Sequence, residues 1–153
     1  MKTFVITFSR VFPATHPRAG EPTFFVDKIT RKEKLHTIRA NPAFWLNVFD
    51  EIRKGNAELS MRYWFDKPYR SAQIEFGRLG KEDGIGIQLL QFNGDLMTPR
   101  VDYWNYPESR ELAKNDGLFF DDWCNWFEHY DLTKDMAIMW LCSQRYNNLT
   151  LNF

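Results

Sequence analysis

Three residues with reactive or hydrogen-bonding side chains lie close together in the chain: Lys34, Thr37 and Arg39. On an extended strand, residues two apart face the same side, so we expect Thr37 and Arg39 to point together. A threonine hydroxyl becomes a nucleophile only beside a base. Lys34 faces away on a straight strand, but a helix-to-strand turn at this residue can bring its amine back toward the hydroxyl.

The chemistry open to these residues depends on the pKa of Lys34. Acting as a base near pH 7 requires lowering this pKa by roughly three units from the value of about 10.4 for a free lysine. Burial or a neighbouring cation such as Arg39 lowers it. The planar guanidinium of Arg39 is equally suited to hold a phosphate or the carbonyl of a base. The alternative interpretation is a solvated lysine, a threonine in a strand and a surface arginine.

A second stretch combines aromatic rings with cations. Residues 62–70 contain four aromatic and three basic side chains. Stacking on an aromatic face contributes about 1–3 kcal/mol per base, and cations between the rings hold the phosphate backbone. The stretch therefore predicts a platform for single-stranded RNA or a nucleobase, with ligand contacts from Arg62, Trp64, Lys67, Tyr69 and Arg70. In the alternative interpretation some of the rings are core residues, and the cations only extend into solvent.

His36 shares its expected strand face with Ile38, which predicts a packed or rim histidine that can still contact a ligand. The other two histidines, His16 and His129, are distant in sequence, and no spacing typical of a metal site occurs. The sequence also contains no glycine-rich phosphate loop and no Ser/His/Asp motif. We therefore expect neither a metal nor a cofactor.

The charge balance limits the classes of partner. The 153 residues carry 20 basic and 20 acidic side chains, which argues against a polybasic nucleic-acid or membrane binder. The charges are unevenly distributed, because residues 1–71 hold 13 Lys and Arg against 7 Asp and Glu, and residues 72–153 hold the reverse. A local basic face is therefore compatible with the neutral total. We find no targeting segment and no apolar run of the roughly 20 residues that a membrane helix needs. We expect a cytoplasmic protein with reduced cysteines and no membrane partner.

The elements that must position these residues are strands interleaved with helices. Apolar alternation and turn signals predict strands at Lys2–Phe8, Leu35–Arg39, Ala57–Trp64, Ser71–Leu79, Gly84–Phe92, Leu96–Tyr103 and Lys134–Arg145. Capping residues and helical spacing predict helices at Thr23–Lys32, Pro42–Ile52, Pro107–Lys114 and Phe119–Tyr130. This order favours the α+β class, with a curled or closed sheet and helices over its ends, in a single domain spanning residues 1–153.

The segment 23–39 resembles the ASCH domain family, whose members are small PUA-like β-barrels. In that family a short helix runs into a K-x-x-T-x-R signature, and Lys34, Thr37 and Arg39 occupy its three positions. The resemblance extends more loosely to residues 114–145, with an inserted helix around residues 42–54. It implies a PUA-like barrel, with helices covering its ends, and a pocket related to nucleic acids.

The same resemblance implies two activities. Many members of the family are thought to bind RNA, and one bacterial branch is an amidohydrolase that removes the acetyl group from acetylcytidine. That branch uses a Lys and a Thr of the signature, here Lys34 and Thr37, together with a glutamate from the later helical region. In this chain the nearest carboxylate is Asp116, one methylene shorter, and Glu111 fits the spacing less well.

We therefore expect RNA or a modified nucleoside to bind at a barrel mouth formed by the signature, the basic aromatic stretch and the turn at Asp116. The first alternative is hydrolysis of an acylated nucleobase such as acetylcytidine, with Thr37 as nucleophile, Lys34 as base and Asp116 assisting. The second alternative is a protein-interaction module that uses exposed aromatic side chains. The sequence predicts neither an oligomeric state nor a pathway.

Overall fold

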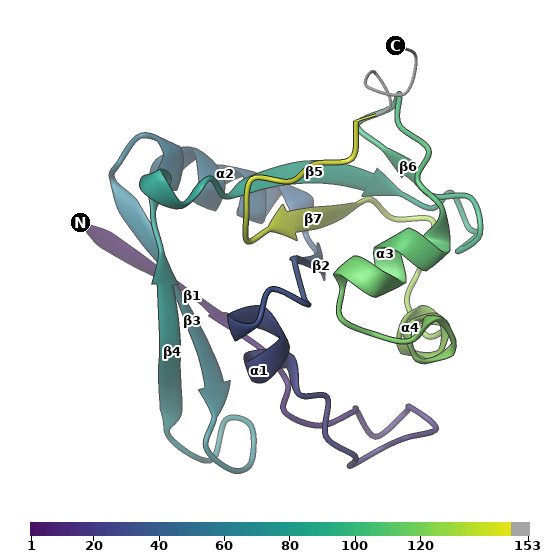
Figure 1. Cartoon of the computed structure of the whole chain (residues 1–153), viewed down its shortest axis with the longest axis horizontal. Coiled ribbons are helices and arrows are strands. Elements are labelled where there is room, and N and C mark those ends of the chain that lie inside the picture. Colours follow the sequence, from purple (N-terminus) through teal and green to yellow (C-terminus); the bar gives the residue numbers. More distant parts are fainter. Residues whose placement is uncertain (148–153) are drawn as a thin grey trace.

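The structure, a computed structural model, describes residues 1–147 and has the expected α+β class (Figure 1). Its strands are β1 (Lys2–Thr7), β2 (His36–Ala40), β3 (Ala57–Trp64), β4 (Gln73–Leu79), β5 (Gly86–Gln91), β6 (Arg100–Val101) and β7 (Met136–Trp140). Its helices are α1 (Phe25–Thr30), α2 (Pro42–Arg53), α3 (Ser109–Asn115) and α4 (Phe120–Phe127), with a short 3-10 helix at Lys81–Asp83. Within the described residues, no helix has the length and hydropathy needed to cross a bilayer.

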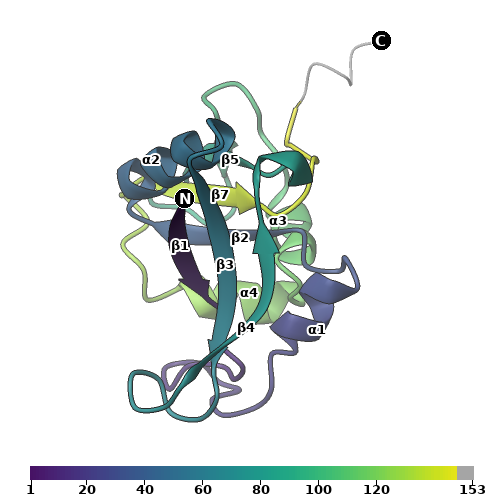
Figure 2. The same ribbon diagram turned by 90° about the vertical axis from the view of Figure 1, so that its left-hand side faces the viewer.

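The strands form two sheets. The first has the order β1-β3-β4, with β1 parallel to β3, and the second has the order β2-β7-β5-β6 and is antiparallel throughout. Figure 2 shows the upright strands of the first sheet crossing in front of β2 and β7. No strand pairing in residues 1–147 joins the two sheets, so hydrogen bonds do not close them into the expected barrel. A side chain bridges them instead, because Arg39 on β2 donates from Nη2 to the backbone carbonyl of Thr7, 2.7 Å away at the end of β1.

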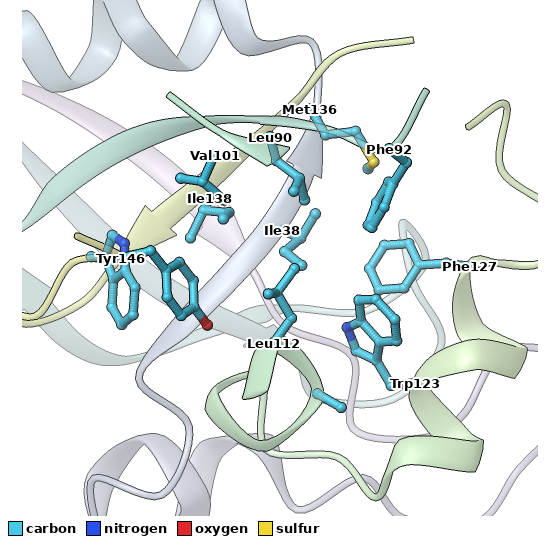
Figure 3. Packing of buried hydrophobic residues seen from close by; sticks show 12 residues of the cluster. Ile38, Leu90, Phe92, Val101, Leu112, Trp123, Phe127, Met136, Ile138 and Tyr146 are labelled. Atoms are coloured by element: carbon cyan, nitrogen blue, oxygen red, sulfur yellow. The ribbon is translucent and has the colours of Figure 1, made fainter. Parts of the chain in front are cut away.

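Strand β7 is buried along its whole length and separates two hydrophobic cores. Side chains of a strand alternate between its faces. Met136, Ile138 and Trp140 therefore pack on one side with residues of α3 and α4 (Figure 3). Ala137 and Met139 pack on the other side with residues of the first sheet and α2. The second sheet is thus the middle layer of the fold.

The predicted strand Leu96–Tyr103 is wrong over most of its length, since only Arg100–Val101 forms a strand. The residues before it form a turn in which the Asp95 carboxylate accepts a hydrogen bond from the backbone N–H of Met97 at 2.8 Å. After it, Asp102 has a φ of 49°. That left-handed conformation ends an extended strand. The predicted final strand Lys134–Arg145 is also too long, since only Met136–Trp140 forms a strand. The other predicted elements are present with shifted ends.

Candidate functional site

A cavity of about 280 Å³ lies where the end of β1, α1, β2, the loop after β3 and the end of α4 meet. Both sheets contribute to its wall, at the place where no strand pairing joins them. Six of the residues that the sequence singled out line this cavity: Lys34, Thr37, Arg39, Trp64, Tyr69 and Asp116. The structure thus brings together residues that are up to 82 positions apart.

Strand β2 aims Thr37 and Arg39 into the cavity from the same face, as their spacing predicts. Arg39 donates from Nε to the Thr37 hydroxyl oxygen at 3.1 Å, and its guanidinium carbon lies 5.1 Å from the centre of the Phe8 ring. Burial lowers the pKa of Arg39 to about 10, against the raising effects of Tyr130 and Asp116. Arg39 therefore remains a cation at neutral pH, held by its hydroxyl and carbonyl partners.

Lys34 enters the cavity from the turn between α1 and β2. Its backbone N–H donates to the carbonyl of Lys28 at 3.0 Å, which bends the chain back on the end of α1. Its Nζ donates to the backbone carbonyl of Asp116 at 2.8 Å, lies 3.6 Å from Asp116 Oδ1 and sits 4.3 Å from the centre of the Phe25 ring. Burial lowers the pKa of Lys34 to about 8, with Arg39 acting in the same direction and Asp116 opposing it. The expected turn at Lys34 is present, but its amine is bonded to Asp116, and no hydrogen bond joins it to Thr37 among the described residues. With a pKa of about 8, Lys34 is mostly a charged ammonium at pH 7.

Asp116 is placed by the end of α3. The backbone N–H of Leu118 donates to the carbonyl of Ala113, and Gly117 adopts a φ of +77°. This is the glycine-terminated helix end known as a Schellman motif. A Cβ at Gly117 would lie 3.0 Å from Cβ of Lys34, so a larger residue would push the two segments apart. The motif therefore fixes the approach of Asp116 to Lys34.

The carboxylate of Asp116 has a hydrogen-bond donor on each oxygen. Its Oδ1 lies 2.8 Å from Nδ1 of His36, and its Oδ2 accepts from the indole N–H of Trp123 at 2.9 Å. Burial alone would raise the pKa of Asp116, but Lys34, His36 and Trp123 together outweigh burial and lower it. Asp116 is therefore an anion that neutralises one of the two cations of the cavity.

Aromatic rings make up much of the remaining wall. Trp64 at the end of β3 and Tyr69 in the following loop have ring centres 5.2 Å apart. Trp126 on α4 faces Phe25 on α1, with ring centres 5.6 Å apart, and Tyr130 follows α4. Trp126 and Tyr130 continue the apolar helical spacing of α4, which is typical of core residues. Their place in the wall depends on how α4 packs against α1, which helical spacing does not specify.

The other predicted ligand-binding residues do not line the cavity. His36 is fully buried behind Asp116, which corresponds to the packed alternative. Arg62 lies on the first sheet and donates to Ser60 and to Gln73 in neighbouring positions. Lys67 and Arg70 are exposed in the loop that carries Tyr69, beside the cavity. Arg62 lies on the same face of β3 as Trp64, but Ser60 and Gln73 hold its guanidinium along the sheet, and only Trp64 at the strand end lines the cavity.

The groups in the cavity suit the recognition of a polar, planar molecule. Two cations and one carboxylate give this lining a net positive charge, and the aromatic rings offer apolar faces. In residues 1–147 no group of three or more His, Cys, Asp or Glu side chains is placed to hold a metal ion. The cavity therefore offers hydrogen-bond donors, a buried ion pair and stacking surfaces.

Comparisons with known proteins add no further constraint. No protein-family model, no curated protein and no solved structure matches the chain. What can be proposed about function thus depends on the cavity and its surroundings.

Proposed function

We propose that the cavity binds a nucleobase, either in a free modified nucleoside or as one base extruded from an RNA strand. The observation that carries this proposal is a single cavity in which aromatic rings surround an arginine, a lysine and a threonine. Its volume of about 280 Å³ lies just below the usual range of ligand pockets, about 300–1,000 Å³, and suits one nucleoside better than a longer segment. Trp64 at the end of β3 and Tyr69 in the exposed loop after it both line the cavity, and an incoming base can stack on their rings.

The polar side of the cavity favours the acceptor edge of a base. Arg39 uses Nε and Nη2 within the protein, and its Nη1 has no hydrogen-bond partner among the described residues. Since every buried side-chain nitrogen and oxygen in residues 1–147 has a partner, this Nη1 is not fully buried, and Arg39 lines the cavity. The Thr37 hydroxyl accepts from Arg39 and so retains its own hydrogen for donation. Two adjacent donors match bases such as cytosine, which presents a carbonyl oxygen beside a ring nitrogen.

Calorimetric titration with a panel of nucleosides and short RNA oligonucleotides tests the proposal. We expect saturable binding of at least one nucleoside, and about tenfold weaker binding by Tyr69→Ala, because stacking contributes about 1–3 kcal/mol per base. Tyr106→Ala is the matched control, since Tyr106 is also exposed but does not line the cavity. Absence of binding by the folded wild-type protein to every nucleoside and RNA would contradict the proposal.

A second candidate function is hydrolysis of an acylated nucleobase. It is favoured by the presence of Lys34, Thr37 and Asp116 in one cavity and by the lowered pKa of Lys34. In this reaction the Thr37 oxygen attacks the acyl carbon while the neutral amine of Lys34 takes its proton. The nucleobase amine leaves with a proton, and water then cleaves the acyl-threonine ester. Asp116 holds Lys34 in place throughout.

The two candidates separate by measuring turnover and binding on the same variants. If the cavity is a hydrolase site, acetylcytidine is converted to cytidine and acetate, and Thr37→Val abolishes turnover while it weakens binding only by the loss of one hydrogen bond. Thr37→Ser is the matched control, because it keeps the hydroxyl and should keep activity. Binding without turnover in the wild-type protein would leave nucleobase recognition as the function.

A further inference from the structure

A chain of hydrogen bonds runs through the protein behind the cavity. Asn115 donates from Nδ2 to the Tyr146 hydroxyl at 3.0 Å, and that hydroxyl lies 2.7 Å from Nε2 of His36. Nδ1 of His36 lies 2.8 Å from Oδ1 of Asp116, which in turn lies 3.6 Å from Nζ of Lys34. All of these groups except Asn115 are buried. The chain therefore connects the C-terminal part of the described protein to the ion pair of the cavity.

The partners in this chain determine its direction. The Tyr146 oxygen already accepts from Asn115, and the only other group bonded to this hydroxyl among the described residues is Nε2 of His36. If Tyr146 donates to Nε2, this nitrogen has no hydrogen, and Nδ1 carries it and donates to Asp116. A protonated His36 would leave the hydrogen of Tyr146 without an acceptor and add a third cation near Lys34 and Arg39. Every donor is satisfied only with a neutral imidazole protonated on Nδ1.

Tyr146 is itself held firmly. The side chain of Gln88 on β5 accepts from the backbone N–H of Tyr146 at 2.9 Å and donates to its carbonyl at 3.0 Å, as a neighbouring strand would. The Tyr146 ring packs on Trp140 with ring centres 4.9 Å apart. Figure 3 shows the ring within the core, with its hydroxyl pointing toward α3. A tyrosine anchored by both backbone and ring provides a fixed donor for His36.

We propose that His36 and Tyr146 are positioning residues, which hold the Asp116 carboxylate in the orientation that serves Lys34. Neither residue lines the cavity, so they act only through Asp116. Their importance for ligand binding or hydrolysis rests on the proposed function, whereas the hydrogen-bond chain can be tested without a ligand. Without His36, the Asp116 carboxylate keeps only the Trp123 donor on Oδ2, and Oδ1 can turn away from Lys34.

The imidazole protonation is tested by two-bond proton–nitrogen spectra, and the chain has only three histidines to assign. We expect His36 to be protonated on Nδ1. His16 is an internal reference of the opposite kind, because its Nδ1 accepts from the backbone N–H of Arg18 and its Nε2 faces the Asp122 carbonyl. In Tyr146→Phe the Nε2 resonance of His36 should move to that of a free acceptor while His16 stays unchanged. An Nε2-protonated or charged His36 in the wild-type protein overturns the proposal.

The positioning role is tested by the titration of Lys34, followed through its carbon-13-labelled side chain. The charged groups acting on Lys34 are Asp116, Arg39 and Lys28, and only the first raises its pKa. In His36→Leu the midpoint should fall by roughly one pH unit, a tenfold change in proton affinity. His36→Asn should restore it, because its amide lies near the position of Nδ1 and still donates to Asp116.

His129→Leu is the matched control for these variants, since His129 is exposed and its only ion-pair partner among the described residues is Glu128. A midpoint that stays the same in His36→Leu overturns the positioning role even if the variant is less stable. With a bound nucleoside, His36→Leu should weaken affinity about tenfold and His36→Asn should not. If no nucleoside binds, the proposed function fails, but the Lys34 midpoint and the His36 protonation still decide the positioning role.

Discussion

The signature segment (residues 34–39) and the aromatic loop (residues 62–70) are both rich in cations, yet the protein uses them differently. Lys34 and Arg39 are withdrawn from solvent. Lys34 is bonded to Asp116, and Arg39 is bonded to the Thr37 hydroxyl and the Thr7 carbonyl. Lys67 and Arg70 are exposed and form no ion pair with other described residues. Residue type alone therefore does not separate a structural cation from a surface one. For Lys34, what distinguishes the buried cation is the carboxylate of Asp116, which is distant in the sequence.

The largest effect should follow from removing that carboxylate. We expect Asp116→Ala to lower the free energy of unfolding by about 3–5 kcal/mol, because the Lys34 ammonium is then buried without its counter-charge. Urea denaturation of the variant and the wild-type protein measures the difference. Asp66→Ala is the matched control in the aromatic loop, where the aspartate is exposed, and should leave the unfolding free energy unchanged.

A double substitution strengthens this test. Replacing both partners with apolar residues, as in Lys34→Met with Asp116→Leu, should recover much of the stability lost in Asp116→Ala, because no unpaired charge remains buried. Ligand binding should not recover, since the polar groups of the cavity are gone. Equal stability of Asp116→Ala and the wild-type protein would show that Lys34 does not need a buried counter-charge. The signature segment and the aromatic loop would then not differ in this respect.

The second effect concerns the shape of the cation. Arg39→Lys keeps the charge but loses the fork that joins Thr37 to the carbonyl of Thr7 across the two sheets. We expect a loss of about 1–3 kcal/mol in unfolding free energy, together with weaker nucleoside binding. Arg70→Lys in the aromatic loop should change neither quantity. Similar behaviour of the two variants in denaturation and calorimetry would contradict a special role for the Arg39 guanidinium.

The third effect is the dependence of stability on pH. Lys34 has a pKa of about 8 in the folded protein, below its ordinary value of 10.5. Between these values the unfolded chain binds more protons, so stability should rise with pH by about 1 kcal/mol per unit. We expect this rise between pH 8 and 9.5 in the wild-type protein and not in Lys34→Met, as measured by urea denaturation. This pH range stays below the Arg39 pKa of about 10, so the titration of Arg39 adds little to the slope.

The matched control for the pH series is Lys67→Met, whose lysine is exposed in the aromatic loop. Its stability should follow the wild-type dependence on pH. The comparison uses slopes rather than absolute stabilities, because Lys34→Met also leaves Asp116 without its cation. Parallel slopes for the wild-type protein and Lys34→Met would show that Lys34 titrates normally.

The same contrast shows which parts of the site local sequence could predict. Strand β2 follows from alternation, and with it the common direction of Thr37 and Arg39, since both depend only on neighbouring residues. Asp116 came from the family resemblance. The cavity lining from Trp126, and the chain through His36 to Tyr146, depend on contacts between distant elements. No local sequence pattern predicts these contacts, because His36 and Tyr146 are far apart in the sequence.

The architecture divides along the same line. The α+β class and most elements followed from periodicity and turn residues, which are local. The missing closure of the barrel did not, since it depends on how two sheets meet. The shortened strand β6 was also missed, because the left-handed conformation of Asp102 is not encoded by the apolar alternation around it.

The smallest effect should come from the exposed cations of the aromatic loop, and it separates a nucleoside from an RNA ligand. In the double variant Lys67→Gln with Arg70→Gln, we expect unchanged stability and unchanged nucleoside affinity, because neither residue lines the cavity. RNA binding should become less sensitive to salt, with the slope of log affinity against log salt falling by roughly 1–2. Calorimetry at three salt concentrations measures this. An unchanged slope would place the RNA backbone elsewhere, and a nucleoside affinity reduced as far as in Tyr69→Ala would place these cations on the base itself.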